Sequence, residues 1–358
     1  MRKGTATLPL HGGRAPRWLF DRMKRLARAL VEVMVEEYGS ERVLERLSDP
    51  VWFQAFGCAL GFDWHSSGVT TTACGALKEG LRGAEQSLGI IVAGGKGAAS
   101  RKTPDEIVAW GDRLGLGFAD ELVYASRMSA KVDNAAVQDG YQIYHHTMIF
   151  TPAGQWAVVQ QGMNEQTGWA RRYHWLSVRL RDFVCEPHAA VCCDHRGQPL
   201  NMVAAASDEA RRMSAVLACE APEKLVREFE QARNLQLPPR HSLGSEHLRP
   251  QSLRRILLST YERQPKGFEA LLGIQGVGPK TIRALALLSE LVHGAPPAYE
   301  DPAKFAFAHG GKDGYPFPVD REAYDSSISF LQEALSKSRV DHTERMHAFR
   351  RLKEFGGR

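Results

Sequence analysis

Apolar residues recur at helical spacing in the first part of the chain. Between residues 17 and 47, leucine, methionine and valine return every three or four positions and alternate with arginine, which predicts an amphipathic helix with a basic side. A second apolar helix is expected after it, ending in a turn crowded with short polar side chains: Asp63, His65, Ser66, Ser67, Thr70, Thr71 and Thr72. Such groups are costly to bury unless they are paired, so this turn is either rich in helix caps or the floor of a polar site.

The pattern changes to strands in the middle of the chain. The apolar run GIIVAGG predicts a strand that enters a glycine-rich loop. The segments YQIYHHTMIF and QWAVVQQGM predict a β-hairpin, because a Thr-Pro-Ala-Gly turn signal separates them. Neighbouring residues on a strand point to opposite faces, so His145 and His146 cannot both serve one site.

From about residue 204 the pattern is helical again, with a proline-rich linker near residues 234–250. We therefore expect a mixed α+β protein. Residues 1–82 (helices and polar turn) and 83–203 (strands and hairpin) would form one α/β unit of catalytic type, followed by an all-helical domain at 204–358.

A helix-hairpin-helix signature is expected inside that last domain, where LLGIQGVGPKTIRALALL joins two apolar helical runs through Gly-Val-Gly. Gly276 and Gly278 would supply positive-φ positions and let backbone N–H groups approach a phosphate oxygen. Lys280 would add a charge beside them. Contacts of this kind do not read base sequence, so Gly276, Val277, Gly278, Lys280 and Thr281 are predicted to hold a nucleic-acid backbone. An ordinary helical hairpin with the same apolar core is the alternative.

Further basic groups support a nucleic-acid partner. The net charge is +5 with a pI near 8.9, and arginine greatly outnumbers lysine, although genomic bias would produce the same excess. The loop after GIIVAGG offers Lys96 and Arg101 as a phosphate cradle, or as a plain basic surface loop. In WARRYHWLS, Arg171 and Arg172 alternate with aromatic residues, which suits a stacked single strand or, alternatively, a packed helix end.

Composition also limits where the protein acts. No apolar run approaches a membrane span, and the first residues lack the apolar core of a signal peptide. We expect a cytoplasmic, nucleoid-associated protein without a membrane partner, and a homodimer is one open alternative for its assembly. The six cysteines form no paired CxxC sets. One cluster between Cys185 and His195 combines cysteine, histidine and aspartate, which are possible metal ligands, but at no standard zinc spacing.

Candidate chemistry gathers around the predicted strands. Phosphodiester hydrolysis requires a hard cation held by carboxylates, and we expect Mg²⁺ or Mn²⁺ as the cofactor. The predicted metal ligands are Asp63, Asp133, Asp139 and Glu165. The predicted catalytic residues are Asp63, His65, Lys131, Asp133, His145 and Gln161, with histidine as base or ligand and lysine as charge stabiliser.

Two family resemblances follow from these motifs. In segments such as GFDWHSSGVTTTACGALKEGL, KVDNAAVQDGYQIYHH and ARRYHWLS, and over nearly its whole length, the chain resembles the prokaryotic domain of unknown function family 763. That resemblance implies a cytosolic, DNA-related protein and no particular reaction. GVGPKT followed by PVD at 318–320 is similar to the motif of helix-hairpin-helix DNA glycosylases of the endonuclease III type, which implies Lys280 as amine nucleophile and Asp320 as its partner.

The chain departs from that glycosylase motif in three ways. The interval between Lys280 and Asp320 is longer, Arg-Glu follows Asp320, and no four-cysteine cluster follows. The sequence therefore favours a DNA-binding, metal-dependent nuclease of DNA repair or processing. A glycosylase with lyase activity at Lys280 and a non-catalytic, structure-specific DNA-binding protein are the alternatives.

Overall fold

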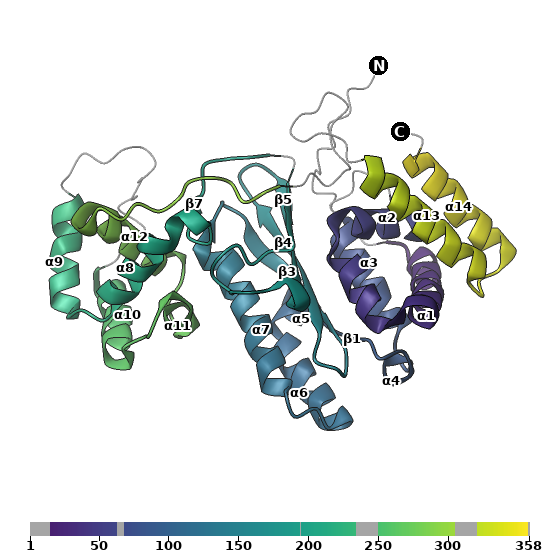
Figure 1. Cartoon of the computed structure of the whole chain (residues 1–358), viewed down its shortest axis with the longest axis horizontal. Helices are drawn as coiled ribbons and strands as arrows, with labels where there is room; N and C mark the ends of the chain where they lie inside the picture. Colours follow the sequence, from purple (N-terminus) through teal and green to yellow (C-terminus); the bar gives the residue numbers. More distant parts are fainter. Residues whose placement is uncertain (1–14, 63–67, 194, 234–249, 305–320, 357–358) are drawn as a thin grey trace, which may run out of the picture.

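A computed structural model describes residues 15–62, 68–193, 195–233, 250–304 and 321–356 of the chain. The predicted mixed α+β class is confirmed, with an antiparallel sheet in the middle of the chain and helices after it. Figure 1 shows the sheet at the centre of an elongated molecule, with a group of helices at each end. No helix in the described ranges is long and apolar enough to span a membrane.

The central sheet has five antiparallel strands in the order β1-β3-β4-β5-β6. These strands are β1 (Ile91–Lys96), β3 (Gln142–Phe150), β4 (Trp156–Asn164), β5 (Trp169–Leu176) and β6 (Ala190–Cys192). The predicted hairpin is confirmed as β3 and β4, which pair from Gln142↔Met163 to Phe150↔Trp156. A separate pair joins β2 (Val137–Gln138) to β7 (Leu200–Asn201).

One face of the sheet, the α1 face, packs against the N-terminal helices. Ile149, Ala157 and Val159 lie in the same core as apolar residues of these helices, which are α1 (Arg17–Ser48), α2 (Pro50–Leu60) and α3 (Gly68–Gly80). Helix α1 bends at Gly39, whose φ of 81° leaves the helical region. Asp49 then starts α2, because its carboxylate accepts from the N–H groups of Val51 and Trp52. A short helix, α4 (Glu85–Leu88), leads into β1.

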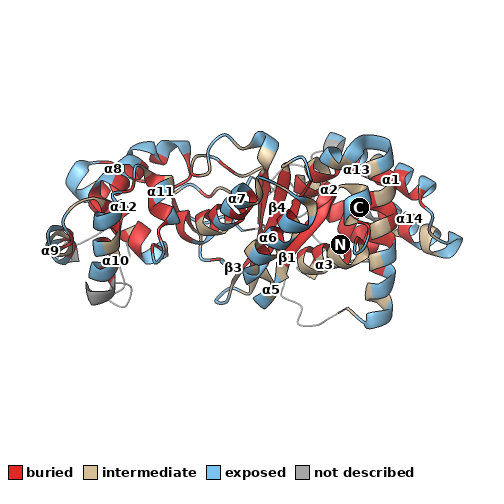
Figure 2. Cartoon of the chain, turned by 90° about the horizontal axis from the view of Figure 1, so that it is seen from below, coloured by how far each residue is buried: buried red, intermediate tan, exposed pale blue. Residues whose placement is uncertain are grey.

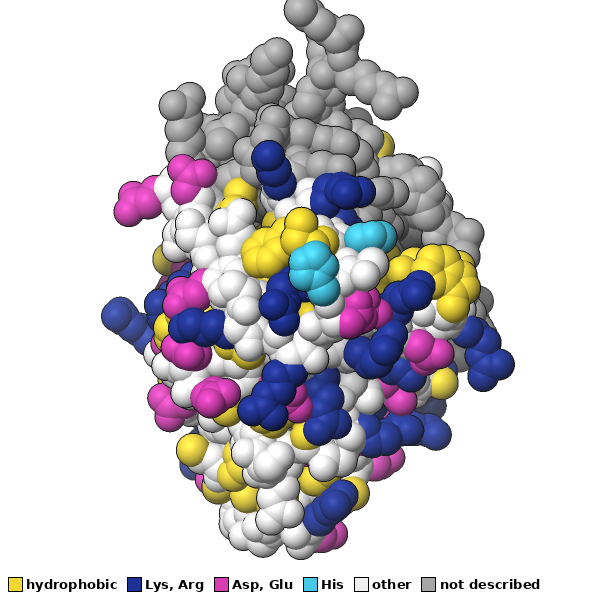
Figure 3. Space-filling view, turned by 90° about the vertical axis from the view of Figure 1, so that its right-hand side faces the viewer, with side chains coloured by type: hydrophobic (Ala, Val, Ile, Leu, Met, Phe, Trp, Pro, Cys, Tyr) yellow, Lys and Arg dark blue, Asp and Glu magenta, His cyan; other side chains and the backbone are white. Residues whose placement is uncertain are grey.

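The last two helices also join this N-terminal core. Leu331, Leu335 and Leu352 are buried in it, from α13 (Arg321–Lys337) and α14 (His342–Gly356). The predicted division at residue 204 groups α13 and α14 with the other C-terminal helices, whereas in the structure they pack with the N-terminal helices. Figure 3 looks onto this end of the molecule, where cationic and acidic side chains are interspersed. Arg25 and Glu344, for example, lie 2.8 Å apart across α1 and α14.

The opposite face of the sheet, the α7 face, packs against α7 (Ala119–Lys131). Met148, Val158 and Trp175 of this face belong to a second core, which continues into the helices beyond it. These helices are α6 (Thr103–Leu114), α8 (Asp208–Ala218), α9 (Pro222–Arg233), α10 (Pro250–Arg263), α11 (Phe268–Gly273) and α12 (Pro279–His293). Figure 2 shows buried residues on the sheet and on the inward sides of the helices.

An extended segment, residues 295–304, connects this second core to the sheet, and we call it the strap. Ala298 forms an isolated β-bridge with Asn201. The N–H of Lys304 donates to the carbonyl of Val191 in β6 at 3.2 Å. The strap therefore leaves α12 and runs along the β6 edge of the sheet toward the N-terminal core (Figure 1).

Candidate nucleic-acid hairpin and buried aspartate centre

The predicted Gly-Val-Gly loop joins α11 to α12 and is stabilised from below by apolar packing. Leu271, Leu272 and Val277 are buried under it. Gly276 has a φ of 92°, so this position favours glycine as expected. Gly278, by contrast, is extended, with a φ of −146°, and caps α12 directly before Pro279. The expectation of a positive φ at Gly278 is therefore wrong.

Gly278 is a glycine that the fold itself does not require. A Cβ atom built on it would meet no other atom within 4 Å, and its extended backbone is open to any residue. The N–H groups of Gly276, Gly278 and Lys280 donate to no acceptor within the described ranges, and the Lys280 side chain is exposed. These three N–H groups lie at the start of the 15-residue helix α12, where the helix dipole favours an anion.

Thr281 does not belong to this exposed surface. Its side chain is only 2% exposed and packs inward with Ile282. Thr281 and Val277 therefore help to build the hairpin core, and of the predicted set Gly276 and Lys280 are exposed and Gly278 is half-buried.

Lys131 fixes the hairpin to the end of α7. Its Nζ donates to the carbonyl of Val277 at 2.6 Å, with a longer contact of 3.5 Å to the carbonyl of Ile274. Burial lowers the pKa of Lys131. Gln138 adds a second anchor, because its amide donates to the carbonyl of Pro279 at 2.8 Å. These contacts make Lys131 a positioning residue for the hairpin.

Asp133 lies in a π-helical turn, η1 (Val132–Ala136), that continues α7 and directs its side chain to the sheet. The carboxylate is fully buried. One oxygen accepts from Gln160 Nε2 at 2.5 Å and from Trp175 Nε1 at 3.0 Å, and the other accepts from His188 Nε2 at 2.6 Å. Three separate segments therefore converge on one carboxylate, as buried charges require.

The same network fixes the proton positions on His146. Because the Gln160 amide nitrogen donates to Asp133, its oxygen accepts from His146 Nδ1 at 2.9 Å. His146 Nε2 is then free to accept from the Ser126 hydroxyl at 2.9 Å. Burial lowers the pKa of His146, in agreement with a neutral ring that donates once and accepts once.

His145 and Gln161 lie on the α1 face, across the sheet from Asp133. His145 Nε2 lies 3.0 Å from the Thr147 hydroxyl, and burial lowers the pKa of His145 to about 3. Gln161 donates to the hydroxyl of Tyr144. The strand alternation that separates His145 from His146 also separates the predicted catalytic residues, so Asp133 shares a face with His146 and Gln160 instead.

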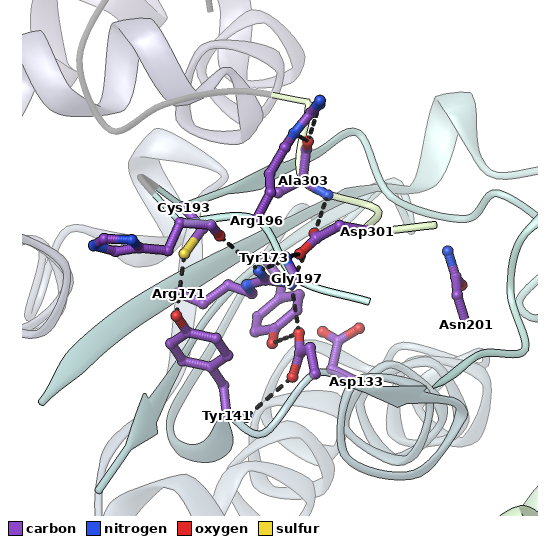
Figure 4. Close-up of polar contacts among 12 residues, drawn as sticks. Asp133, Tyr141, Arg171, Tyr173, Cys193, Arg196, Gly197, Asn201, Asp301 and Ala303 are labelled. Carbon is purple, nitrogen blue, oxygen red and sulfur yellow. Dashed lines mark hydrogen bonds and ion pairs between the residues drawn. The ribbon is translucent and has the colours of Figure 1, made fainter. Parts of the chain in front are cut away.

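Arg171 and Arg172 are interior residues, contrary to their predicted contact with nucleic acid. Both lie on β5, whose two faces are covered. Arg171 pairs with Asp139 at 2.9 Å and with Asp301 of the strap at 2.8 Å (Figure 4). The Tyr173 hydroxyl also donates to Asp139, at 2.6 Å. On the other face, Arg172 donates to His174 Nε2 at 2.9 Å.

The described members of the predicted metal set do not share a site. Both oxygens of Asp133 accept from N–H groups, and Asp139 is occupied by Arg171 and Tyr173. Glu165 is exposed in the turn after β4. Among residues that the structure describes, no three His, Cys, Asp or Glu side chains are placed to hold a metal ion. In the Cys185 to His195 cluster this covers every candidate ligand except Asp194, which lies outside the described residues. Asp63 and His65 lie outside the described residues. The described donors therefore do not fit Mg²⁺ or Mn²⁺.

The predicted glycine-rich loop is wrong as far as Lys96, because Gly94, Gly95 and Lys96 belong to β1 and pair with β3. The N–H of Gly94 donates to Glu106 at 2.8 Å, and Lys78 binds both that carboxylate and the Gly94 carbonyl. The ion pair of Lys78 and Glu106 thereby covers part of β1, which is an edge strand of the sheet. Lys96 and Arg101 remain exposed, and the helix after the loop, α5 (Ala98–Arg101), has only four residues. Their contact with nucleic acid stays a prediction.

Two residues of the buried centre, His188 and Asp301, could not be assigned to it from the sequence. His188 lies in the Cys185 to His195 cluster of possible metal ligands, but in the structure it is a partner of Asp133. Asp301 lies 130 positions from Arg171, in a segment that reads as a helix breaker. A histidine directly before the short apolar run of β6, in EPHAAV, is the local signal that points to His188. The second has no local signal.

Comparisons with known proteins add a family and no activity. No curated protein and no solved structure matches the chain. A family model described as "Protein of unknown function (DUF763)" matches residues 4–319 of the 358. The chain therefore belongs to the DUF763 family.

Proposed function

We propose that this protein binds the phosphate backbone of DNA through the loop between α11 and α12, in DNA repair or processing. The observation that carries the proposal is Gly278, where neither backbone conformation nor packing calls for glycine. Absence of a side chain there leaves room for a ligand to approach the free N–H groups. Together with the exposed Lys280, this arrangement suits a phosphate oxygen and reads no base sequence.

The proposal is tested by adding one methyl group at Gly278. Gly278→Ala should leave the fold intact and weaken binding to labelled single-stranded and duplex DNA by about tenfold, equally for all sequences. Gly273→Ala is the matched control, because a Cβ there meets only the end of Met128 at 3.8 Å. Lys280→Ala should reduce the salt dependence of binding by about one charge. Unchanged affinity in Gly278→Ala and Lys280→Ala would refute the proposal.

Metal-dependent hydrolysis of phosphodiester bonds is a second candidate function. This reaction would need oxygen ligands other than Asp133 and Asp139, whose carboxylates are taken by protein donors, and Asp63 lies outside the described residues. Purified protein is incubated with single-stranded, duplex, flap and abasic DNA, with Mg²⁺, with Mn²⁺ and with chelator. Cutting of intact strands that depends on the metal supports the nuclease, whereas binding without cutting supports a structure-specific DNA-binding protein.

A lyase reaction at Lys280 is distinguished by a covalent product. A nucleophilic amine forms a Schiff base with the aldehyde of an abasic site, which borohydride traps. Lys280 is exposed beside the hairpin, and Asp320, its partner by resemblance, lies outside the described residues. We expect no trapped adduct, since a phosphate-binding lysine makes no covalent bond. A trapped adduct that disappears in Lys280→Ala would instead identify Lys280 as the nucleophile of a lyase.

A further inference from the structure

A cavity of about 320 Å³ lies at the β1 edge of the sheet, between α3 and α6, and we call it the β1 cavity. Figure 2 shows β1 between these two helices. Val92 of β1 lines the cavity, together with Lys78 and Leu81 at and just after the end of α3 and Trp110 and Arg113 of α6. An edge strand therefore borders an open space that holds both apolar and cationic side chains.

Alternate residues of β1 turn their main-chain groups outward, away from β3. Antiparallel pairing makes successive residues alternate between the two directions. The N–H of Gly97 donates to the carbonyl of Tyr144 in β3 at 2.8 Å, so the odd-numbered residues face β3. The even-numbered residues Ile90, Val92 and Gly94 consequently face outward.

The outward groups before and after the cavity are already bonded within the protein. The N–H of Ile90 donates to the Glu85 carbonyl at 3.2 Å. The N–H of Gly94 donates to the Glu106 carboxylate at 2.8 Å, and its carbonyl accepts from Lys78 at 2.8 Å. The open part of this edge is therefore one residue long.

Val92 is that residue, and its main-chain groups face the β1 cavity. Val92 is only 5% exposed, and within the described ranges its N–H and carbonyl have no partner outside the sheet. Nearly buried main-chain groups require partners. One residue of an extended peptide supplies both, because directly opposite residues of an antiparallel pair exchange two hydrogen bonds.

Arg113 adds a cation to the same cavity. Its guanidinium lies over the Trp110 ring, 4.7 Å from the centroid, and it forms no ion pair with a carboxylate among the described residues. Helix α6 contacts Gly94 through Glu106 and reaches Arg113 about two turns later, toward the start of β1. A peptide antiparallel to β1 directs its carboxyl end the same way. The cation therefore lies where such a peptide places a negative charge.

We propose that the β1 cavity binds the C-terminal residue of an extended peptide from a partner protein. The N–H of that residue donates to the Val92 carbonyl, and its free carboxylate accepts from the Val92 N–H and pairs with Arg113. A continuous strand cannot pair here, because both flanking positions are occupied. Opposite residues share a face, so the terminal side chain lies beside that of Val92, near Leu81, and is apolar. The site is separate from the hairpin and does not depend on nucleic-acid binding.

The test uses the full-length protein and a fluorescein-labelled peptide, Ala-Ala-Ala-Val, with a free carboxylate. The same peptide as its C-terminal amide is the comparison, and sodium acetate is a competitor that offers a carboxylate alone. We expect saturable binding of the acid by fluorescence anisotropy, about tenfold tighter than that of the amide. The Val92 amide resonance of protein labelled with ¹⁵N at valine should shift with it. Equal binding of acid and amide, no saturable binding, or displacement by acetate at the peptide's own concentration would overturn the proposal.

Two variants and a control locate the binding. Arg113→Gln changes an exposed side chain and should remove the preference for the acid over the amide. Ala109→Phe places a ring in the cavity from an exposed position of α6, so it should prevent binding of both peptides. Arg127→Gln removes an exposed cation from α7 and should bind as the wild type does, and unchanged thermal unfolding midpoints verify the fold of all three. Wild-type binding in Ala109→Phe, or an unchanged preference in Arg113→Gln, would contradict the proposed site.

Discussion

Asp133 shows how one buried carboxylate determines the identity of its neighbours. Its donors come from β4, from β5 and from the segment before β6. The Gln160 contact further sets the tautomer of His146. Periodicity places Gln160 and His146 on one face of the sheet, and that much follows from sequence. The contact of His188 with Asp133 could not be predicted, because it depends on the path of the irregular connection between β5 and β6.

We expect Asp133→Asn to be markedly less stable. The new NH₂ group either faces the N–H donors of Gln160 and Trp175 or forces His188 into its other tautomer, and a neutral amide replaces the bonds to a carboxylate, so we expect the free energy of unfolding to fall by about 2–3 kcal/mol. Urea unfolding measures the change. Asp112→Asn, an exposed substitution on α6, is the control. Equal stability of both variants would show that the carboxylate is not the centre of this network.

Stability should also fall in weak acid because of three buried histidines. Burial lowers the pKa of His146, lowers that of His145 to about 3 and lowers that of His174 well below its usual value. The unfolded chain takes up these protons near pH 6.5 and the folded one does not. Stability is therefore complete above pH 6.5 and declines below it, by up to about 1.4 kcal/mol per pH unit for each histidine.

Denaturant unfolding between pH 7 and pH 5 measures this decline. Replacing His145 by glutamine should make it less steep. A stability that is constant over that interval would mean that the imidazoles are protonated in the folded protein.

At the scale of elements, the hairpin and α7 act as one unit. The loop of α11 and α12 could be predicted because its glycines and apolar spacing are local features. Its attachment through Lys131 and Gln138 could not, since these residues are separated from the loop by more than 130 positions. The misassignment of Arg171 and Arg172 has a similar origin: alternation of basic and aromatic residues describes an exposed binding strand and a covered strand equally well.

Lys131→Met should separate the hairpin from α7 while preserving the apolar stem of the side chain. Loss of a charged hydrogen bond to Val277 lets the loop move, and we expect DNA affinity to fall by up to about tenfold with little change in the thermal unfolding midpoint. Lys353→Met removes an equal charge from α14, where the side chain is exposed. If both variants lose the same affinity, net charge and not hairpin position is responsible.

For the whole molecule, Arg171 connects the sheet to the strap. Its guanidinium lies between Asp139 and Asp301, and Asp301 also accepts from the N–H of Gly197 at 2.8 Å. The mixed fold class, the hairpin and the strands could be predicted from periodicity. The return of α13 and α14 to the N-terminal core could not, because amphipathic helices do not encode which apolar surface they will cover.

Arg171→Met should destabilise the protein strongly, by about 3–5 kcal/mol, because two buried carboxylates lose their cation. Arg212→Met is the control, since Arg212 makes an exposed pair within α8. Limited proteolysis should then cleave the strap of Arg171→Met before the rest of the chain. Resistance equal to that of the wild type would show that the ion pairs do not retain the strap.

The late position of α13 and α14 has a consequence for synthesis on the ribosome. Helices α1 to α3 emerge first, but Leu331, Leu335 and Leu352 complete their core only when nearly the whole chain has been translated. At about 5–20 residues per second, the nascent N-terminal helices wait on the order of tens of seconds with an uncovered apolar surface. Completion of this core therefore waits for α13 and α14, and until they emerge the exposed apolar surface favours aggregation.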